Sequence, residues 1–244
     1  MIFDLNMEFD FGNGKSAIHP VVIKGEKENI LIDCGFPGFL PLIEKAAKDR
    51  GFSLADLTHI IITHHDHDHM GSLKELKEKY SHIKSVSSLI EKPYIEGDKK
   101  SLRLEQAEAL YPSLSEEEKK NALVFHKILE KTPKAEIDIT IDGDKKLDWC
   151  GGIEIVTTPG HMPGHIAVYV PAEKTLITGD ALTAEGGTLL FANPQYTLDM
   201  AGAGKSIEKL LSYDIETIIC YHGGIITGDI EKKLRAVLNS QVMK

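Results

Sequence analysis

Four imidazoles and two carboxylates fall in six consecutive positions of the sequence, His64, His65, Asp66, His67, Asp68 and His69. With Thr63 before them, they follow the apolar residues 60–62, and Gly71 lies two positions after His69. Imidazole and carboxylate together form the ligand set of a divalent transition metal. Because a strand that ends in a loop can direct several side chains into one cavity, this segment predicts a metal site. The alternative is a solvated histidine-rich loop.

Three further metal-type ligands each lie beside turn glycines at the end of an expected strand. They are His161, after residues 153–156, Asp180, after residues 176–177, and His222, after residues 218–219. Taken alone, each segment is typical of an ordinary turn. Together with the first cluster, they supply the additional ligands that a two-metal site requires.

The elements that must position these side chains are short β-rich runs bounded by turn residues. The expected strands cover residues 20–23, 29–32, 58–62, 153–156, 166–170, 176–178 and 217–220. Apolar residues at helical spacing predict helices over residues 39–48 and after the N-cap residue Asp229. Strands followed by a helix, twice over, indicate two packed sheets with helices on the outside.

Residues 92–135 interrupt this alternation with a charged segment in which we expect helices. Ser115 and Glu118 have the spacing of a capping box at the start of a helix. We expect this helical insertion to cover one mouth of the core, and a solvated surface excursion without a functional role is the alternative. Because no repeat, low-complexity tract or flexible linker is evident, we expect residues 1–244 to form one domain.

The composition restricts the class of partner. The 244 residues include 28 Lys and Arg against 37 Asp and Glu, a formal net charge of −9, and no basic run stands out, which disfavours a nucleic-acid partner. No apolar stretch approaches the roughly 20 residues that cross a membrane, and the N-terminus lacks a secretory pattern. Three widely spaced cysteines argue for a reducing compartment. We therefore expect a cytoplasmic enzyme that acts on a small molecule.

The order of these segments resembles the signature of the metallo-β-lactamase superfamily. The matching features are the cluster at 63–71, the Pro-Gly-His turn at 159–161, the Gly-Asp pair at 179–180 and the His-Gly pair at 222–223. Residues 30–35 are similar to the family's early strand and turn. The resemblance covers about residues 20–224 and implies an α/β fold, a four-layer αββα sandwich with metal ions at one edge of two facing sheets.

The resemblance also implies a ligand set, with one departure. Aligning the family pattern Thr-His-x-His-x-Asp-His-x-Gly on residues 63–71 places Asp66 where an imidazole is usual. Two divalent ions are then expected, the first on His64, Asp66 and His161, the second on Asp68, His69 and His222, with Asp180 between them. The alternative is a local slip in which His65 or His67 reaches the first metal.

This ligand set predicts a mechanism. A carboxylate at position 66 adds negative charge and a harder donor, which favours manganese or iron more than the usual site does, while zinc remains the expected metal. Two ions roughly 3.5–4 Å apart share a hydroxide and polarise the scissile carbonyl. Asp68 is expected to orient that hydroxide or move its proton. Tyr196 is a candidate donor to a developing oxyanion, and a surface tyrosine packed before a helix cap is the alternative.

The expected function is a dinuclear metal-dependent hydrolase that cleaves a small thioester, lactone or other ester, similar to hydroxyacylglutathione hydrolases and acyl-homoserine lactonases. One alternative is an iron-dependent redox enzyme of the same fold, since oxygen-reducing members carry a carboxylate at the position of Asp66. Iron content and flavin dependence distinguish it. Another is a metal-binding effector with weak turnover, which a panel of generic substrates distinguishes.

Overall fold

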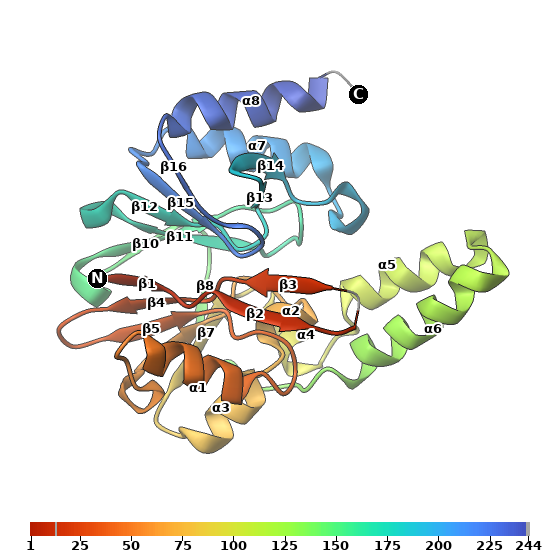
Figure 1. Ribbon diagram of the computed structural model, residues 1–244, viewed down its shortest axis with the longest axis horizontal. Helices are drawn as coiled ribbons and strands as arrows, with labels where there is room; N and C mark the ends of the chain where they lie inside the picture. The colour runs from red at the N-terminus through yellow and green to blue at the C-terminus, as the bar shows by residue number, and fades with distance from the viewer. Residues whose placement is uncertain (13, 243–244) are drawn as a thin grey trace.

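Two six-stranded β-sheets face each other in the computed structural model, which describes residues 1–12 and 14–242 (Figure 1). The first sheet has the strand order β1 (Ile2–Asp4), β4 (Val21–Lys24), β5 (Asn29–Ile32), β6 (His59–Ile61), β7 (Lys84–Ser88) and β8 (Ile139–Ile141). The second has the order β16 (Gly224–Thr227), β15 (Thr217–Cys220), β12 (Thr175–Ile177), β11 (Ile166–Val170), β10 (Ile153–Thr157) and β9 (Lys145–Leu147). Two hairpins, β2 (Met7–Asp10) with β3 (Lys15–Ile18) and β13 (Leu182–Glu185) with β14 (Thr188–Phe191), complete the strands of the described residues.

Helices cover the outer faces of both sheets. Figure 1 shows α1 (Leu40–Asp49) and α3 (Leu73–Lys79) outside the first sheet, and α7 (Met200–Leu210) and α8 (Ile230–Val242) outside the second. The predicted αββα sandwich is therefore confirmed. None of the helices in the described part of the chain is long and apolar enough to cross a membrane.

Successive side chains along a strand point to opposite faces of its sheet, and in these sheets both faces are covered. In β5, Ile30 and Ile32 pack between the two sheets, whereas Leu31 packs under the helices on the outside. In β11, Val168 faces the space between the sheets and Ala167 faces the outer helices. Because both faces are covered, the strands read as nearly continuous apolar runs, which made them recognisable in the sequence.

The insertion at 92–135 is helical, as predicted, and contains α4 (Lys92–Glu96), α5 (Leu102–Leu110) and α6 (Glu116–Lys131). The capping box is present at the start of α6: the Ser115 hydroxyl accepts from the Glu118 N–H at 3.3 Å, and the Glu118 carboxylate accepts from the Ser115 N–H at 2.8 Å. Figure 1 shows α5 and α6 side by side, extending from one side of the sandwich.

A carboxylate outside the site supports the edge of the first sheet. Asp138 Oδ2 accepts hydrogen bonds from the Ser85 N–H at 2.8 Å and from Lys77 Nζ at 2.7 Å, which links the start of β8 to β7 and α3. Burial opposes the charged form, but Lys77 and Ser85 hold the pKa of Asp138 well below its usual range.

We expect Asp138→Asn to reduce the free energy of unfolding by about 1–3 kcal/mol at pH 7. Because the folded-state pKa of Asp138 is lowered, its stabilisation is present above the unfolded-state value and disappears as the pH falls through the folded-state value. Urea unfolding between pH 7 and pH 3 should therefore show a constant difference between wild type and variant above the usual carboxyl pKa of about 4, and a difference that shrinks below it. A difference that stays constant throughout, or an equal loss in the exposed control Asp98→Asn, would contradict this role.

Candidate metal centre

The predicted ligands lie at the carboxyl ends of strands from both sheets. In the second sheet β10 and β12 each pair antiparallel with β11, and β12 pairs parallel with β15, so β10, β12 and β15 run in the same direction. Their carboxyl ends, which precede His161, Asp180 and His222, thus lie at one edge. The first sheet contributes the segment after β6, where Asp66 is the N-cap residue of the short helix α2 (His67–Met70).

Two glycines permit close backbone contacts around the site. A Cβ at Gly71 would lie 2.3 Å from the backbone nitrogen of Pro37, which no side chain can tolerate. Gly179 has φ +49°, and a Cβ there would lie 2.8 Å from His165 Nε2. Glycine is therefore required where the loop before Asp180 passes the segment after β6.

The first predicted ligand cluster is assembled in the structure. Asp66 Oδ2 lies 3.4 Å from His64 Nε2 and 3.0 Å from His161 Nε2. His64 is fully buried, and Asp66 and His161 are buried as well. A four-coordinate ion with ligands about 2 Å away separates its donor atoms by roughly 3.3 Å, so these distances suit one small divalent ion.

The second predicted cluster lies beside the first. Asp68 Oδ2 lies 3.1 Å from His222 Nε2 and 3.8 Å from His69 Nε2. His69 is fully buried, whereas 36% of the His222 side chain is exposed to solvent. The second cluster is therefore open to solvent on the side of His222.

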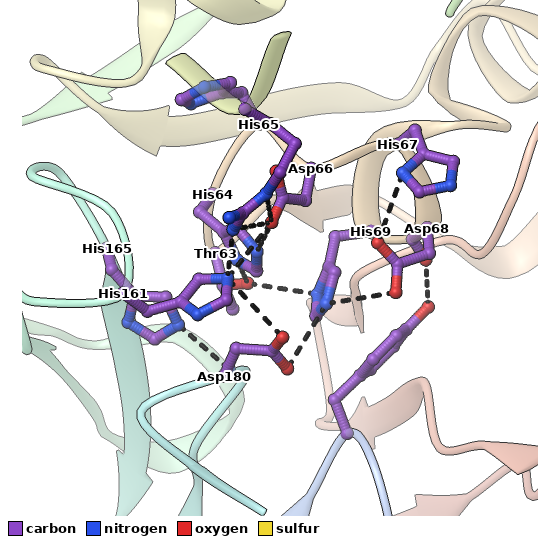
Figure 2. Close-up of polar contacts among 12 residues, drawn as sticks. Thr63, His64, His65, Asp66, His67, Asp68, His69, His161, His165 and Asp180 are labelled. Atoms are coloured by element: carbon purple, nitrogen blue, oxygen red, sulfur yellow. Dashed lines mark hydrogen bonds and ion pairs between the residues drawn. The ribbon is translucent and has the colours of Figure 1, made fainter. Parts of the chain in front are cut away.

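Asp180 faces both clusters with different oxygens (Figure 2). Its Oδ1 lies 3.3 Å from His69 Nε2 and 3.7 Å from His222 Nε2, while its Oδ2 lies 3.6 Å from His161 Nε2. A carboxylate in this position suits the expected role of bridging two cations.

Hydrogen bonds behind the ligands fix which ring nitrogen faces the centre. His69 Nδ1 lies 2.8 Å from Asp33 Oδ2, and the Thr63 hydroxyl donates to the same oxygen at 2.8 Å. Since that hydroxyl is used as a donor, it accepts from His64 Nδ1, which lies 3.0 Å away. Both imidazoles therefore present Nε2 to the centre, as metal-binding histidines do when a second partner holds the other nitrogen.

Three of the buried polar atoms that lack a hydrogen-bond partner face the centre and fit bound cations. Among the described residues, His64 Nε2, His69 Nε2 and Asp180 Oδ1 are buried and have no hydrogen-bond partner. Buried polar atoms are normally paired, and a role in binding an ion is one accepted reason for an exception. All three belong to the predicted ligand set, so the residues present fit divalent metal ions.

The ionisable groups favour a cation in the centre. Burial opposes the charge of Asp180, but His222 and His69 hold its pKa well below its usual range. Burial likewise raises the pKa of Asp66, yet the Arg103 guanidinium is the largest of the opposing effects that hold it well below its usual range. The carboxylates of the centre are therefore negatively charged at neutral pH.

His65 points away from the centre (Figure 2). Its Nδ1 contacts the buried Glu91 carboxylate, its Nε2 accepts from the Leu102 N–H at 3.2 Å, and its ring stacks on Tyr94 with centroids 4.6 Å apart. Both nitrogens are thus occupied. Among the described residues, the group of potential ligands that contains His64 and His161 includes Asp66 and neither His65 nor His67.

Two buried residues that contact the segment of the predicted ligands were not predicted from the sequence. Arg103, from α5, is 3% exposed and its Nη2 lies 2.7 Å from Asp66 Oδ2. Its charge offsets the negative charge that Asp66 was expected to add to the first cluster. Glu91, which is fully buried, binds His65 and accepts from the Gly164 N–H at 2.9 Å. No spacing rule links these positions to their partners.

A family model described as the metallo-beta-lactamase superfamily matches residues 14–222. The chain belongs to the metallo-β-lactamase superfamily. This membership supports a metal-dependent hydrolase. It also agrees with the ordered signature that the sequence resembles.

The amino-acid sequence is similar to those of several curated proteins, including the following two. The chain is 30% identical over 215 residues to a probable metallo-hydrolase, YflN, of Bacillus subtilis, covering 82% of this chain and 76% of that protein. It is 28% identical over 182 residues to a hydroxyacylglutathione hydrolase of Bartonella tribocorum, covering 74% of this chain. The matched part spans about half of that second relative, 53% of its length.

Solved structures share the fold. A metallo-β-lactamase family protein from Thermus thermophilus superposes with a TM-score of 0.76 over 99% of this chain and 79% of that one, at 19% identity. An archaeal superfamily protein from Sulfolobus tokodaii gives a TM-score of 0.62 over 92% of this chain and 80% of that one, at 21% identity. At these identities the likeness concerns the fold alone.

The centre of this superfamily member opens into a cleft of about 590 Å³. Its apolar lining consists of Phe36, Phe125, Leu190, Phe191, Pro194 and Tyr196. Tyr196 is 40% exposed, and its ring centroid lies 5.3 Å from Arg103 Cζ. Arg103 comes from α5 and Phe125 from α6, so the helical insertion at 92–135 forms part of the wall of this cleft. This agrees with the expectation that the insertion covers one mouth of the core.

Proposed function

We propose that the chain is a dinuclear metal-dependent hydrolase that cleaves a small thioester, lactone or other ester with an apolar acyl part. The observation that carries this proposal is the position of Asp180, which turns one oxygen toward each of two ligand clusters. A single-ion site needs no carboxylate placed in this way. The relatives named as a metallo-hydrolase and a hydroxyacylglutathione hydrolase support the same class of reaction.

Zinc is the metal we propose, with manganese or iron as alternatives that elemental analysis distinguishes. When bound, two such ions make water nucleophilic near neutral pH and polarise the carbonyl of the substrate. His64, Asp66 and His161 would hold one ion, Asp68, His69 and His222 the other, and Asp180 would contact both. The three cysteines are free, which supports the proposed cytoplasmic location.

Asp68 and Tyr196 are the residues we propose to act on the reacting groups. Asp68 lines the cleft, and its Oδ2 is held 3.1 Å from His222 Nε2. A carboxylate held in the lining of the cleft can orient the attacking water and accept its proton. Tyr196 lines the same cleft, where its hydroxyl would donate to the oxygen that gains negative charge.

The lining of the cleft supports an apolar acyl group. Among the residues that line it, Arg103 is the one with a permanent positive charge, and Asp66 already pairs with that charge. A substrate with several carboxylates would therefore find little charge complementarity. We propose that the aromatic and aliphatic wall binds an acyl chain instead.

A substrate panel tests the proposed function. Metal-loaded protein should hydrolyse esters, thioesters or lactones with apolar acyl chains faster than acetyl esters, phosphodiesters or β-lactams. Activity should disappear on chelation and return with added Zn²⁺ or Mn²⁺. Binding of metal without turnover of any compound in the panel would contradict the proposal and favour the effector alternative.

We expect Phe125→Ala to raise KM for a long-chain acyl substrate by roughly 10–100-fold, because about 1.5–3 kcal/mol of apolar contact is lost. KM for the acetyl analogue should change little. The matched control is Leu123→Ala in the same helix, since Leu123 is 47% exposed and lies outside the cleft lining. Equal effects of Phe125→Ala on both substrates would show that this wall does not bind the acyl chain.

A further inference from the structure

The guanidinium of Arg103 contacts two of the side chains that would hold the first ion. Its Nη2 lies 2.7 Å from Asp66 Oδ2 and 3.1 Å from His161 Nε2, and its Nε lies 3.2 Å from both carboxylate oxygens of Asp66. A positive charge therefore already occupies the neighbourhood of the first cluster.

Several contacts hold this guanidinium in place. Arg103 is 3% exposed, its Nη1 donates to Gln106 Oε1, and its Cζ lies 5.3 Å from the centre of the Tyr196 ring. Gln106 is in turn tied to the segment before Tyr196, because its Nε2 donates to the Gln195 carbonyl at 3.0 Å. The position of the charge is thus defined by α5 and by the loop across the cleft.

The second cluster has no such competitor. Within the described part of the chain, the ion pairs of Asp68, His69 and His222 are formed with one another and with Asp33, Asp180 and His67, and none involves a lysine or arginine. The two clusters therefore differ in charge although both contain two histidines and one aspartate.

We propose that Arg103 competes with a metal ion for the first cluster, so that the two positions fill in a fixed order. This inference rests on the proposed two-metal function. The second cluster, with Asp180, fills first and tightly. The first cluster fills with lower affinity, because Arg103 Nη2 lies 3.1 Å from His161 Nε2, on the nitrogen that would bind the metal. In the tautomer in which this nitrogen accepts from Arg103, its single in-plane lone pair is not free for a metal ion.

Charge adds to this competition. The carboxylate of Asp66 is already paired with a cation, and an incoming divalent ion is repelled by that same cation at close range. Filling the first position therefore requires the guanidinium to withdraw at least from His161. At limiting metal concentration, the protein should hold one ion per chain, with the Arg103 guanidinium beside it.

Calorimetric titration of the metal-free full chain with Zn²⁺, and separately with Mn²⁺, tests the order of filling. In wild type we expect two steps whose Kd values differ by about tenfold or more. In Arg103→Met the weaker step should tighten by about tenfold or more, while the tighter step stays the same. Arg103→Met leaves the buried carboxylate of Asp66 without its partner and could impair folding. Arg103→Gln is therefore measured as well, because its neutral amide can still donate to Asp66, and its weaker step should also tighten.

Arg235→Met serves as the matched control, because Arg235 is an exposed arginine paired with Glu231 on α8. Its two steps should equal those of wild type. Two wild-type steps of equal affinity, or Arg103 variants whose weaker step is unchanged or weakened, would overturn the competition while leaving the metal site intact. Absence of any saturable binding in wild type would instead overturn the proposed function on which the inference rests.

Discussion

Asp180→Asn is expected to lower kcat/KM by at least about 10³-fold, which corresponds to roughly 4 kcal/mol of transition-state stabilisation. The reason is the position of the carboxylate, which turns one oxygen toward His69 and the other toward His161. An asparagine side chain keeps the shape but supplies a single neutral oxygen. The variant should therefore lose the charge that we propose to hold two cations together.

The fold of Asp180→Asn should be retained. The backbone N–H of residue 180 donates to His165 Nε2 at 3.0 Å, and this contact does not involve the side chain. Circular dichroism and thermal unfolding of the metal-free variant should match those of wild type, with Asp98→Asn as a surface control. Wild-type activity in a folded Asp180→Asn protein would remove the bridging assignment.

Asp66→His is expected to destabilise the protein, although it installs the imidazole that the superfamily pattern carries at this position. The structural reason is Arg103, which is buried and paired with Asp66 at 2.7 Å. Removing one partner of a buried ion pair leaves the other charge uncompensated, which costs about 3–5 kcal/mol. Urea unfolding of the metal-free protein measures this loss.

The double variant Asp66→His/Arg103→Met should recover most of the lost stability, since it removes the unpaired cation as well. The four proteins form a double-mutant cycle whose coupling energy isolates the Asp66–Arg103 pair. If Asp66→His alone were as stable as wild type, the buried charge of Arg103 would not need Asp66 as its partner. The role of Asp66 in compensating that charge would then be wrong.

Local patterns in the sequence were sufficient to predict the sandwich. The structure has strands at 29–32, 166–170 and 217–220, as expected, because residues buried on both faces form short apolar runs between turns. The helix after Asp229 and the capping box at Ser115 also follow from local hydrogen bonding. That residues 1–244 form one domain stays a prediction.

The seven expected ligands could be named from the sequence because they follow expected strands and because the order of these segments resembles the superfamily signature, which implied the ligand set. Contacts that depend on the path of the insertion could not be predicted. Arg103 reaches Asp66 only because α5 lies across the cleft, and 37 positions separate the two residues. Likewise, nothing near His65 in the sequence indicates that Glu91 binds its ring.

The most direct test of the central claim is a count of metal ions bound per folded chain. Metal-free protein should be saturated with Zn²⁺, separated from free metal by gel filtration and submitted to elemental analysis. We expect up to two ions per chain in wild type and a clear loss in His69→Ala. A correctly folded wild-type chain that retains no zinc, manganese or iron above background would contradict the claim.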